Sequence, residues 1–404
     1  MKKLLVGLMT GALAVTGLAA CSGGGATSRT IQVDYHSDDF AGSFLGFYPR
    51  EVTVTPGMTL NFHQTWTGEP HTVTFGTVVD KGIKPVLPLL DDVAAGKKAL
   101  PDQPPPEYNQ DLFETKLPTF FPHSDSSTLQ QDAAHPCYLT SISLFPKNHA
   151  KPCTKAQQQQ PTFTGKLAYY SSGFIPFEGQ QGNTYQIKID PKAKPGTYFY
   201  FCSIHGVPMG GKITIKPGAK VESQAALNRR GKTEADRIAT PLKKVYDKEL
   251  AGQGQYKGNL AGSGDDSTNN LEGVINEFTP RTINAKVGEK VTWTFDGNHT
   301  LTFNVPPYTP LFTFNKKGTL TTNGGLDKAK GGWPGAPDGH SDFDGPPPPA
   351  IHLDAGNFDG SGGLKSSGTG FNSGDTYAVT FTKAGTYPYA CLIHPGMIGK
   401  VVVK

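Results

Sequence analysis

The sequence predicts an all-β protein made of two tandem domains, and three observations support this fold class. The chain has 404 residues, which is too long for one ordinary β-sandwich. It contains 49 glycines and 33 prolines, and its apolar residues alternate over short runs, as half-buried strands require. The segments Gly196–His205 and Gly385–His394 read GTYFYFCSIH and GTYPYACLIH and agree at seven of ten positions. The same strand and turn therefore occur once in each half.

The chain begins with a targeting segment, residues 1–21. Lys2 and Lys3 precede an apolar run over residues 4–20, which is the pattern of a signal peptide. The run ends in Leu-Ala-Ala-Cys, which resembles a bacterial lipobox, so Cys21 would be acylated and become the mature N-terminus. An ordinary signal peptide cut at the end of the run is the alternative. Residues 22–28 are predicted to be a flexible tether.

Residues 29–217 and 255–404 are predicted to form the two domains, with a helical linker over 218–254. Apolar residues recur at helical spacing in the linker. Thr240 followed by Pro241 has the pattern of an N-cap and the first residue of a helix, so we expect two short helices here. A solvated linker is the alternative.

Each domain carries a long insertion, at about 80–164 and 306–363. Both insertions are rich in Pro, Gly and Asp and show weak periodicity. Insertions of this length are tolerated thermodynamically and are usually functional or partly disordered. They could cap a functional site, form a partner surface or pack the domains together. The strands around them are clearer, because alternating apolar pairs predict one buried face: Val52 and Val54, Ile213 and Ile215, and Val401 and Val403.

Each half holds side chains with the types and spacing of a copper site. The downstream ligands are Cys202, His205 and Met209 in the first half and Cys391, His394 and Met397 in the second. A thiolate, an imidazole and a thioether are soft or borderline ligands that suit copper in both oxidation states, whereas Mg²⁺ and Ca²⁺ prefer oxygen.

The remaining ligand of each set lies upstream. The segments 49–76 and 280–304 align as Pro-Arg, an alternating strand, a Gly turn, a second strand and then His-Thr-x-Thr-Phe. The alignment predicts His71 and His299 as the second imidazoles. Two histidines, one cysteine and a weak axial methionine are the ligands of a blue copper centre.

These motifs resemble the cupredoxin superfamily, specifically its plastocyanin, amicyanin and pseudoazurin branch, over the cores of both halves. The Cys391–Met397 loop has the His-to-Met spacing of amicyanin and pseudoazurin, and the Cys202–Met209 loop has a longer step, more similar to azurin. The resemblance implies a Greek-key β-sandwich in each domain and two type 1 copper ions. It also implies one-electron transfer with redox proteins of an extracytoplasmic electron-transport chain.

Residues beside the ligands are expected to tune the two sites. Ile204 and Ile393 stand where plastocyanin and amicyanin have proline, so each can donate an extra amide hydrogen bond to the thiolate. Such a bond would stabilise Cu(II) and lower the reduction potential. Thr72 and Thr300 follow the first histidine ligands and are expected to hold the cysteine-bearing loop through their hydroxyls.

Cysteine usage predicts one disulfide. The chain has five cysteines, of which one is the lipid acceptor and two are metal ligands. Cys137 and Cys153 remain, and in an oxidising compartment we expect them to be bonded to each other. A free buried pair is the alternative.

The favoured function is an electron carrier, anchored by lipid at the extracytoplasmic face of the cell membrane. Copper nitrite reductases and multicopper oxidases also have tandem domains of this type, but they couple the blue copper to a catalytic copper through a histidine next to the cysteine. Here the neighbours are Phe201 and Ser203, and Ala390 and Leu392, so the sequence argues against an enzyme. A copper-binding or copper-delivery protein is the main alternative, and an enzyme with its catalytic metal in the insertions is another.

The charge of the chain adds no further class of partner. The formal net charge is +4, and removal of Lys2 and Lys3 with the signal segment lowers it to +2. A balance this small does not call for nucleic acid or a strongly anionic surface.

Overall fold

A computed structural model gives the structure of most of the chain. It describes residues 27–35, 40, 42–64, 71–94, 97, 131–148, 151–175, 183–251, 258–262, 273–297, 299–305, 310–314, 320–323, 350–368, 373–394 and 396–404. Cys21 and the predicted targeting segment lie outside these residues. No helix in the described ranges has both the length and the apolar character needed to cross a membrane.

The first half is built on two sheets. One has the order β3-β1-β5-β9 and the other the order β4-β11-β10-β6-β8-β7. Their strands are β1 (Ser28–Val33), β3 (Phe47–Tyr48), β4 (Glu51–Val54), β5 (Thr59–Gln64), β6 (Thr74–Phe75), β7 (Cys137–Leu139), β8 (Tyr169–Ser171), β9 (Thr184–Lys188), β10 (Gly196–Cys202) and β11 (Gly206–Ile215). One core cluster combines residues of both sheets, such as Ile31 and Leu60 with Val52 and Ile213, so the sheets pack as a sandwich.

The second half repeats this architecture. Its sheets have the orders β14-β12-β16-β22-β20 and β15-β24-β23-β17-β21. Their strands are β12 (Asn259–Gly262), β14 (Phe278–Thr279), β15 (Thr282–Ala285), β16 (Lys290–Asp296), β17 (Thr302–Phe303), β20 (His352–Phe358), β21 (Lys365–Ser366), β22 (Thr376–Phe381), β23 (Gly385–Ala390) and β24 (Ile398–Val403). Trp293 is fully buried between the sheets, where it packs against Phe303 and Tyr389.

The pairing register matches between the halves. Ile213 lies beside Val52 in the first half, as Val401 lies beside Ile283 in the second. The three alternating pairs predicted to face the core, at positions 52 and 54, 213 and 215, and 401 and 403, are all buried. The predicted all-β fold class is therefore confirmed, whereas the domain limits 29–217 and 255–404 stay predictions.

The described parts of the insertions contain short elements. They are α1 (Thr77–Ile83), α2 (Leu87–Ala94), α3 (Gln131–Ala134), the 3₁₀ helix η2 (Ile142–Leu144), β18 (Phe312–Phe314) and β19 (Leu320–Thr322). Cys137 and Cys153 form the predicted disulfide, with Cα atoms 5.8 Å apart. The bridge ties β7 to the segment that follows η2, and both cysteines belong to a small apolar cluster that includes Val79 and Leu139.

The expectation of two short helices in the linker is wrong, because residues Gln224–Leu250 form one helix, α4, of 27 residues. The helix is capped by Ser223, whose side chain accepts a hydrogen bond from Ala226 N, and Pro241 lies inside it. A proline in a helix interior costs about 3 kcal/mol. Leu242 and Val245 are buried beyond it, and each such side chain gains about 1.5–3 kcal/mol on burial. Packing thus outweighs the local signal at Pro241.

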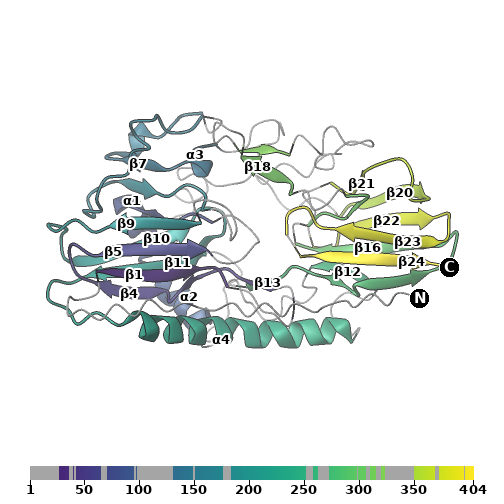
Figure 1. Ribbon diagram of the computed structural model, residues 1–404, viewed down its shortest axis with the longest axis horizontal. Coiled ribbons are helices and arrows are strands. Elements are labelled where there is room, and N and C mark those ends of the chain that lie inside the picture. Colours follow the sequence, from purple (N-terminus) through teal and green to yellow (C-terminus); the bar gives the residue numbers. More distant parts are fainter. Residues whose placement is uncertain are drawn as a thin grey trace, which may run out of the picture.

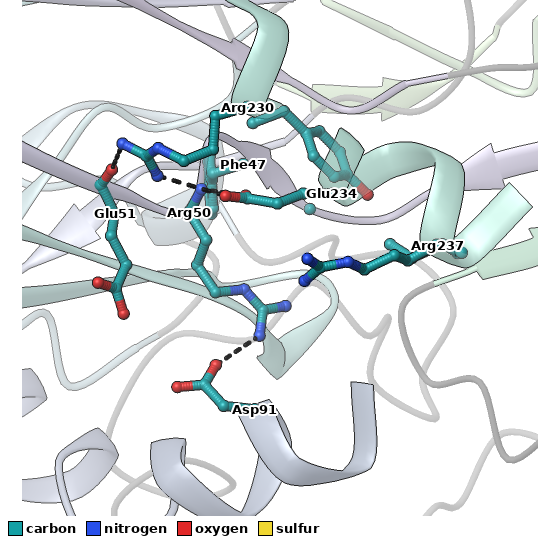
Figure 2. Close-up of a pocket in the computed structure, with 10 residues that line it drawn as sticks. Phe47, Arg50, Glu51, Asp91, Arg230, Glu234 and Arg237 are labelled. Atoms are coloured by element: carbon teal, nitrogen blue, oxygen red, sulfur yellow. Dashed lines mark hydrogen bonds and ion pairs between the residues drawn. The ribbon is translucent and has the colours of Figure 1, made fainter. Parts of the chain in front are cut away.

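Charged contacts fix α4 to the first half (Figure 2). Glu234 accepts a hydrogen bond from the backbone N–H of Arg50 at 2.8 Å and from the guanidinium of Arg230 at 3.3 Å. The guanidinium of Arg50 in turn binds Asp91 of α2 at 3.2 Å and the carbonyl of Pro208 at 3.2 Å. These contacts connect the helix to the strand that carries the first predicted methionine ligand.

The halves are also joined by a strand pair. β2 (Gly42–Phe44) and β13 (Gly273–Ile275) form a two-stranded antiparallel sheet, and Asn276 Nδ2 donates to Ser43 Oγ at 2.9 Å. Helix α4 covers this sheet and runs along both halves, and β13 and β18 lie between them (Figure 1). Phe40, Phe44 and Ile275 pack against the helix in one apolar cluster.

Candidate metal centres

The first centre lies at the end of β10. Cys202 is the last residue of that strand, His205 lies in the turn to β11, and His71 precedes β6. The Nδ1 atoms of His71 and His205 are 3.1 Å apart, and Cys202 Sγ lies 3.8 Å and 3.6 Å from them. His71 and Cys202 are fully buried, and His205 is half-buried. The structure thus brings together the three residues that the sequence singled out.

Mutual contacts shift the protonation of this cluster. Burial alone would raise the pKa of the Cys202 thiol, but hydrogen bonds with His205 and His71 lower it well below its usual range. Burial alone would lower the pKa of His71, but hydrogen bonds with Asp34 and Cys202 raise it to about 9. These hydrogen bonds favour the thiolate of Cys202, which is the form that binds a metal.

The second centre repeats this geometry at the end of β23. The Nδ1 atoms of His299 and His394 are 3.0 Å apart, and Cys391 Sγ lies 3.6 Å from His394 Nδ1. The three ligand atoms lie within 4.8 Å of one another, as they do in the first centre. All three side chains are buried. Burial would raise the pKa of Cys391, but hydrogen bonds with the two histidines lower it well below its usual range.

Two threonines brace the cysteine loops, as the sequence predicts. Thr72 Oγ1 accepts a hydrogen bond from Ser203 N at 2.7 Å, and Thr300 Oγ1 accepts one from Leu392 N at 2.8 Å. Each hydroxyl therefore ties the strand of the first histidine to the residue after the cysteine. This contact limits how far the histidine and the thiolate can move apart.

The amide donors to the sulfurs differ from the expectation. Within the described residues, Thr72 N donates to Cys202 Sγ and Thr300 N donates to Cys391 Sγ, each at 3.4 Å, rather than Ile204 and Ile393. The two isoleucines are partly buried, and each packs against the cores of its own half. Ile204 and Ile393 also pack against two further apolar clusters, one each, and Phe312 of β18 packs against both of these clusters.

The predicted methionine ligands are buried in the same core clusters as their cysteines. Met209 belongs to the same core cluster as Cys202, and Met397 to the same cluster as Cys391. In the second half the backbone closes the ligand loop on itself, because Met397 N donates to His394 O at 3.2 Å and Cys391 N donates to Met397 O at 3.0 Å. These hydrogen bonds fix the position of the Met397 backbone relative to Cys391.

The residues of both clusters fit copper. In three of the four ligand histidines, His71, His205 and His394, the ring nitrogen that approaches the thiolate is Nδ1. The Nδ1 atoms of the two histidines lie 3.1 Å apart in the first cluster and 3.0 Å apart in the second. A buried set of two imidazoles and one thiolate with a nearby thioether suits copper, whereas Ca²⁺ and Mg²⁺ take oxygen ligands. His71, Cys202 and His205 would hold one ion, and His299, Cys391 and His394 a second.

Sequence reasoning missed one residue of the first centre. Asp34 follows β1, is fully buried, and places Oδ2 3.0 Å from His71 Nε2. Its other oxygen, Oδ1, accepts a hydrogen bond from Tyr35 N at 2.7 Å. The residue lies 37 positions before His71 and outside every ligand motif. The pairing of β1 with β5 brings it to the site, and no local signal predicts that contact.

One family model matches the chain. Residues 356–404 match the copper binding proteins of the plastocyanin/azurin family. The matched segment includes Cys391, His394 and Met397, and so covers three of the four predicted ligands of the second centre. No curated protein is similar enough in sequence to give a match.

Solved structures with local similarity include forms of amicyanin and a purple cupredoxin. One is the reduced Cu(I) form, at pH 4, of an amicyanin mutant, with 21% sequence identity, 32% of this chain and 73% of that chain covered, and a TM-score of 0.18. Another is a novel purple cupredoxin from Nitrosopumilus maritimus, with 19% identity, 32% of this chain and 83% of that chain covered, and a TM-score of 0.16. These likenesses extend over about a third of the chain.

Proposed function

The match over residues 356–404 supports assignment of the chain to the cupredoxin superfamily, and on this basis we propose that the protein is an electron carrier with two type 1 copper centres. It is held at the extracytoplasmic face of the membrane by a lipid on Cys21. Its partners are redox proteins of an electron-transport chain in the same compartment.

The observation that carries the proposal is the duplicated ligand cluster. Both halves bring two imidazole nitrogens and a thiolate sulfur within 4.8 Å of one another. Bound copper supplies the one-electron chemistry, because this ligand set accepts both of its oxidation states. The protein's part is to keep the ligands in one arrangement. Burial, the threonine braces and the hydrogen bonds of Thr72 and Thr300 to the sulfurs all oppose rearrangement.

Copper delivery is the second candidate. A delivery site needs ligands that a partner can reach and exchange. Here Cys202, Cys391 and His71 are fully buried, His299 and His394 are 4% and 5% exposed, and His205 is half-buried. These burial values favour retention of the metal and therefore favour the carrier.

The proposal is tested by the visible absorption spectrum and the copper content of the chain purified without residues 1–21. We expect two coppers per chain and a strong thiolate-to-copper band toward the red end of the spectrum. Copper bound without such a band contradicts the carrier. Steady turnover of nitrite, or of a phenol with oxygen, well above that of free copper would indicate an enzyme instead.

The lipid anchor needs its own experiment. Cys21→Ser should abolish incorporation of labelled fatty acid in a bacterial host and move the protein from the membrane fraction to the soluble extracytoplasmic fraction. If the wild-type chain takes up no labelled fatty acid, the proposed lipid anchor on Cys21 is wrong.

A further inference from the structure

Asp34 and Gly262 occupy equivalent positions in the two halves. In the first half Gln32 pairs with Tyr48, and in the second half Leu260 pairs with Thr279. Asp34 lies two positions after Gln32, and Gly262 lies two positions after Leu260. The backbone N–H of Asp34 donates to Gly46 O at 2.9 Å, and that of Gly262 donates to Glu277 O at 3.0 Å. The acceptor residues also correspond, because Gly46 lies two positions before Tyr48 and Glu277 lies two positions before Thr279.

Both positions face the first histidine ligand of their own centre. Asp34 Oδ2 lies 3.0 Å from His71 Nε2. A Cβ atom built on Gly262 would lie 2.9 Å from His299 Nε2 and 1.9 Å from the carbonyl oxygen of Asp296. His299 therefore packs against a glycine at the position where His71 meets a carboxylate. The two centres share their ligand types but differ at this position.

The backbone conformation supports a specific role for the aspartate. Asp34 has φ of 61° and Gly262 has φ of 122°. Positive φ is disfavoured for residues with a Cβ, so glycine is the relaxed choice for this turn. The first half keeps a side chain in this conformation, and the fully buried carboxylate makes hydrogen bonds through both oxygens. Strain of this kind is found where a side chain has a function.

We propose that Asp34 is a positioning residue that makes the first copper centre the one with the lower reduction potential. The inference rests on the proposed copper function. His71 presents Nδ1 to Cys202 and His205 and Nε2 to Asp34, so the carboxylate fixes both the tautomer and the orientation of the ring. A carboxylate that accepts a hydrogen bond from the ring nitrogen that does not bind the metal raises the basicity of the histidine ligand.

Charge acts in the same direction. The carboxylate adds negative charge in a buried region, where electrostatic interactions are screened less than in water. Negative charge near the ion favours Cu(II) over Cu(I), because Cu(II) carries the larger positive charge. The second centre has a glycine in this place and gains no such preference from it. Of the two sites, the first would therefore hold the oxidised ion more strongly, and the second would accept an electron more readily.

The experiment isolates each centre before it changes Asp34. Cys391→Ser leaves only the first blue site, and Cys202→Ser leaves only the second. In each background we compare Asp34 with Asp34→Asn, which removes the charge and keeps a hydrogen-bond acceptor, and with Asp34→Gly, which copies the second half. The readout is the midpoint potential of the blue band in a spectroelectrochemical titration. Competition with a Cu(II) chelator provides a second readout.

Removal of the charge should weaken Cu(II) binding at the first site at least tenfold relative to Cu(I), since changes around metal-bound histidines typically cost 10–100-fold in affinity. A tenfold change corresponds to an upward shift of about 59 mV for a one-electron couple. Asp34→Gly should raise the potential as well, and its glycine relaxes the turn, so it tests the idea even if Asp34→Asn folds poorly. In the Cys202→Ser background neither change should move the potential of the second site.

The inference is overturned if both substitutions leave the potential of the first site unchanged, or if they shift the two sites equally. It is also overturned if the wild-type first site has the higher potential. These results would leave the two blue centres in place. A wild-type protein without a thiolate-to-copper band would instead overturn the copper function itself, and the role of Asp34 with it.

Discussion

The side chain of Gln131 pairs with the backbone of Leu320 much as a neighbouring strand would. Gln131 Nε2 donates to Leu320 O at 2.6 Å, and Gln131 Oε1 accepts from Leu320 N at 2.9 Å. Both residues are buried, although they lie 189 positions apart, in the insertions of different halves. Of the three roles that the sequence leaves open for the insertions, this contact supports packing of the two halves together.

Gln131→Ala should destabilise the protein by about 2 kcal/mol, because it leaves a buried N–H and a buried carbonyl without their partner. Denaturation in urea, followed by tryptophan fluorescence, measures the loss. Gln159 is exposed, so Gln159→Ala is the matched control and should change stability by less than about 0.5 kcal/mol. Equal stability of Gln131→Ala and wild type would mean that the contact contributes nothing.

Each centre should bind its copper independently of the other. Each ligand cluster is drawn from one half only. We therefore expect Cys391→Ser to remove one copper per chain and one thiolate-to-copper band, and Cys202→Ser to leave the complementary band. Absorption and metal analysis of the two variants check this. Loss of both bands in either folded variant would indicate a shared site.

The disulfide should stabilise the first half. Cys137 and Cys153 close a loop with a sequence separation of 16. A loop of this length corresponds to about 3 kcal/mol of stabilisation in the chain-entropy model. Replacement of both cysteines by serine should lower stability by this order, while the copper content stays at two per chain. A change in copper content instead would place these residues in the metal chemistry.

Asp80 should make folding sensitive to pH. Burial raises the pKa of Asp80 to about 6, although the hydrogen bond from Phe199 N partly opposes this shift. An aspartate in an unfolded chain has a pKa of about 3.9. Between these values the folded state binds the proton more strongly, so the contribution of Asp80 to stability falls as the pH rises from about 4 to 6.

The thermal unfolding of the metal-free protein between pH 4 and 7 tests this contribution. Asp80→Asn retains an acceptor for Phe199 N and cannot ionise, so its unfolding temperature should decline less over this range than that of wild type. The same slope for both proteins would show that the carboxyl of Asp80 does not set the pH dependence.

Residues close in the repeat could be predicted, and residues brought together by strand order could not. Most ligands of each cluster lie in a local Cys, His and Met motif at the end of a strand. The alignment of the two upstream segments then predicts His71 and His299 as the remaining ligands. Asp34 becomes a neighbour of His71 only when β1 pairs with β5. The contact between Gln131 and Leu320 joins two insertions that show only weak periodicity, so no sequence pattern predicts it.

The linker shows how a correct local signal can be outweighed. Thr240 and Pro241 form a good helix start, but Leu242 and Val245 are buried in the same cluster as Phe44 and Ile275. Those partners come from β2 and β13, on either side of α4 in the chain. Without knowledge of this cluster, the helix could not be predicted to continue through the proline.

The pairing of β2 with β13 also sets an order of assembly for the chain as it is synthesised. Domains generally fold from the N-terminus first. The two sheets of the first half contain strands only up to Ile215, so they can form before the second half exists. The apolar cluster that contains Phe44 cannot form until α4 and Ile275 have been synthesised. The first half therefore emerges with an incomplete apolar edge, and the later half covers it.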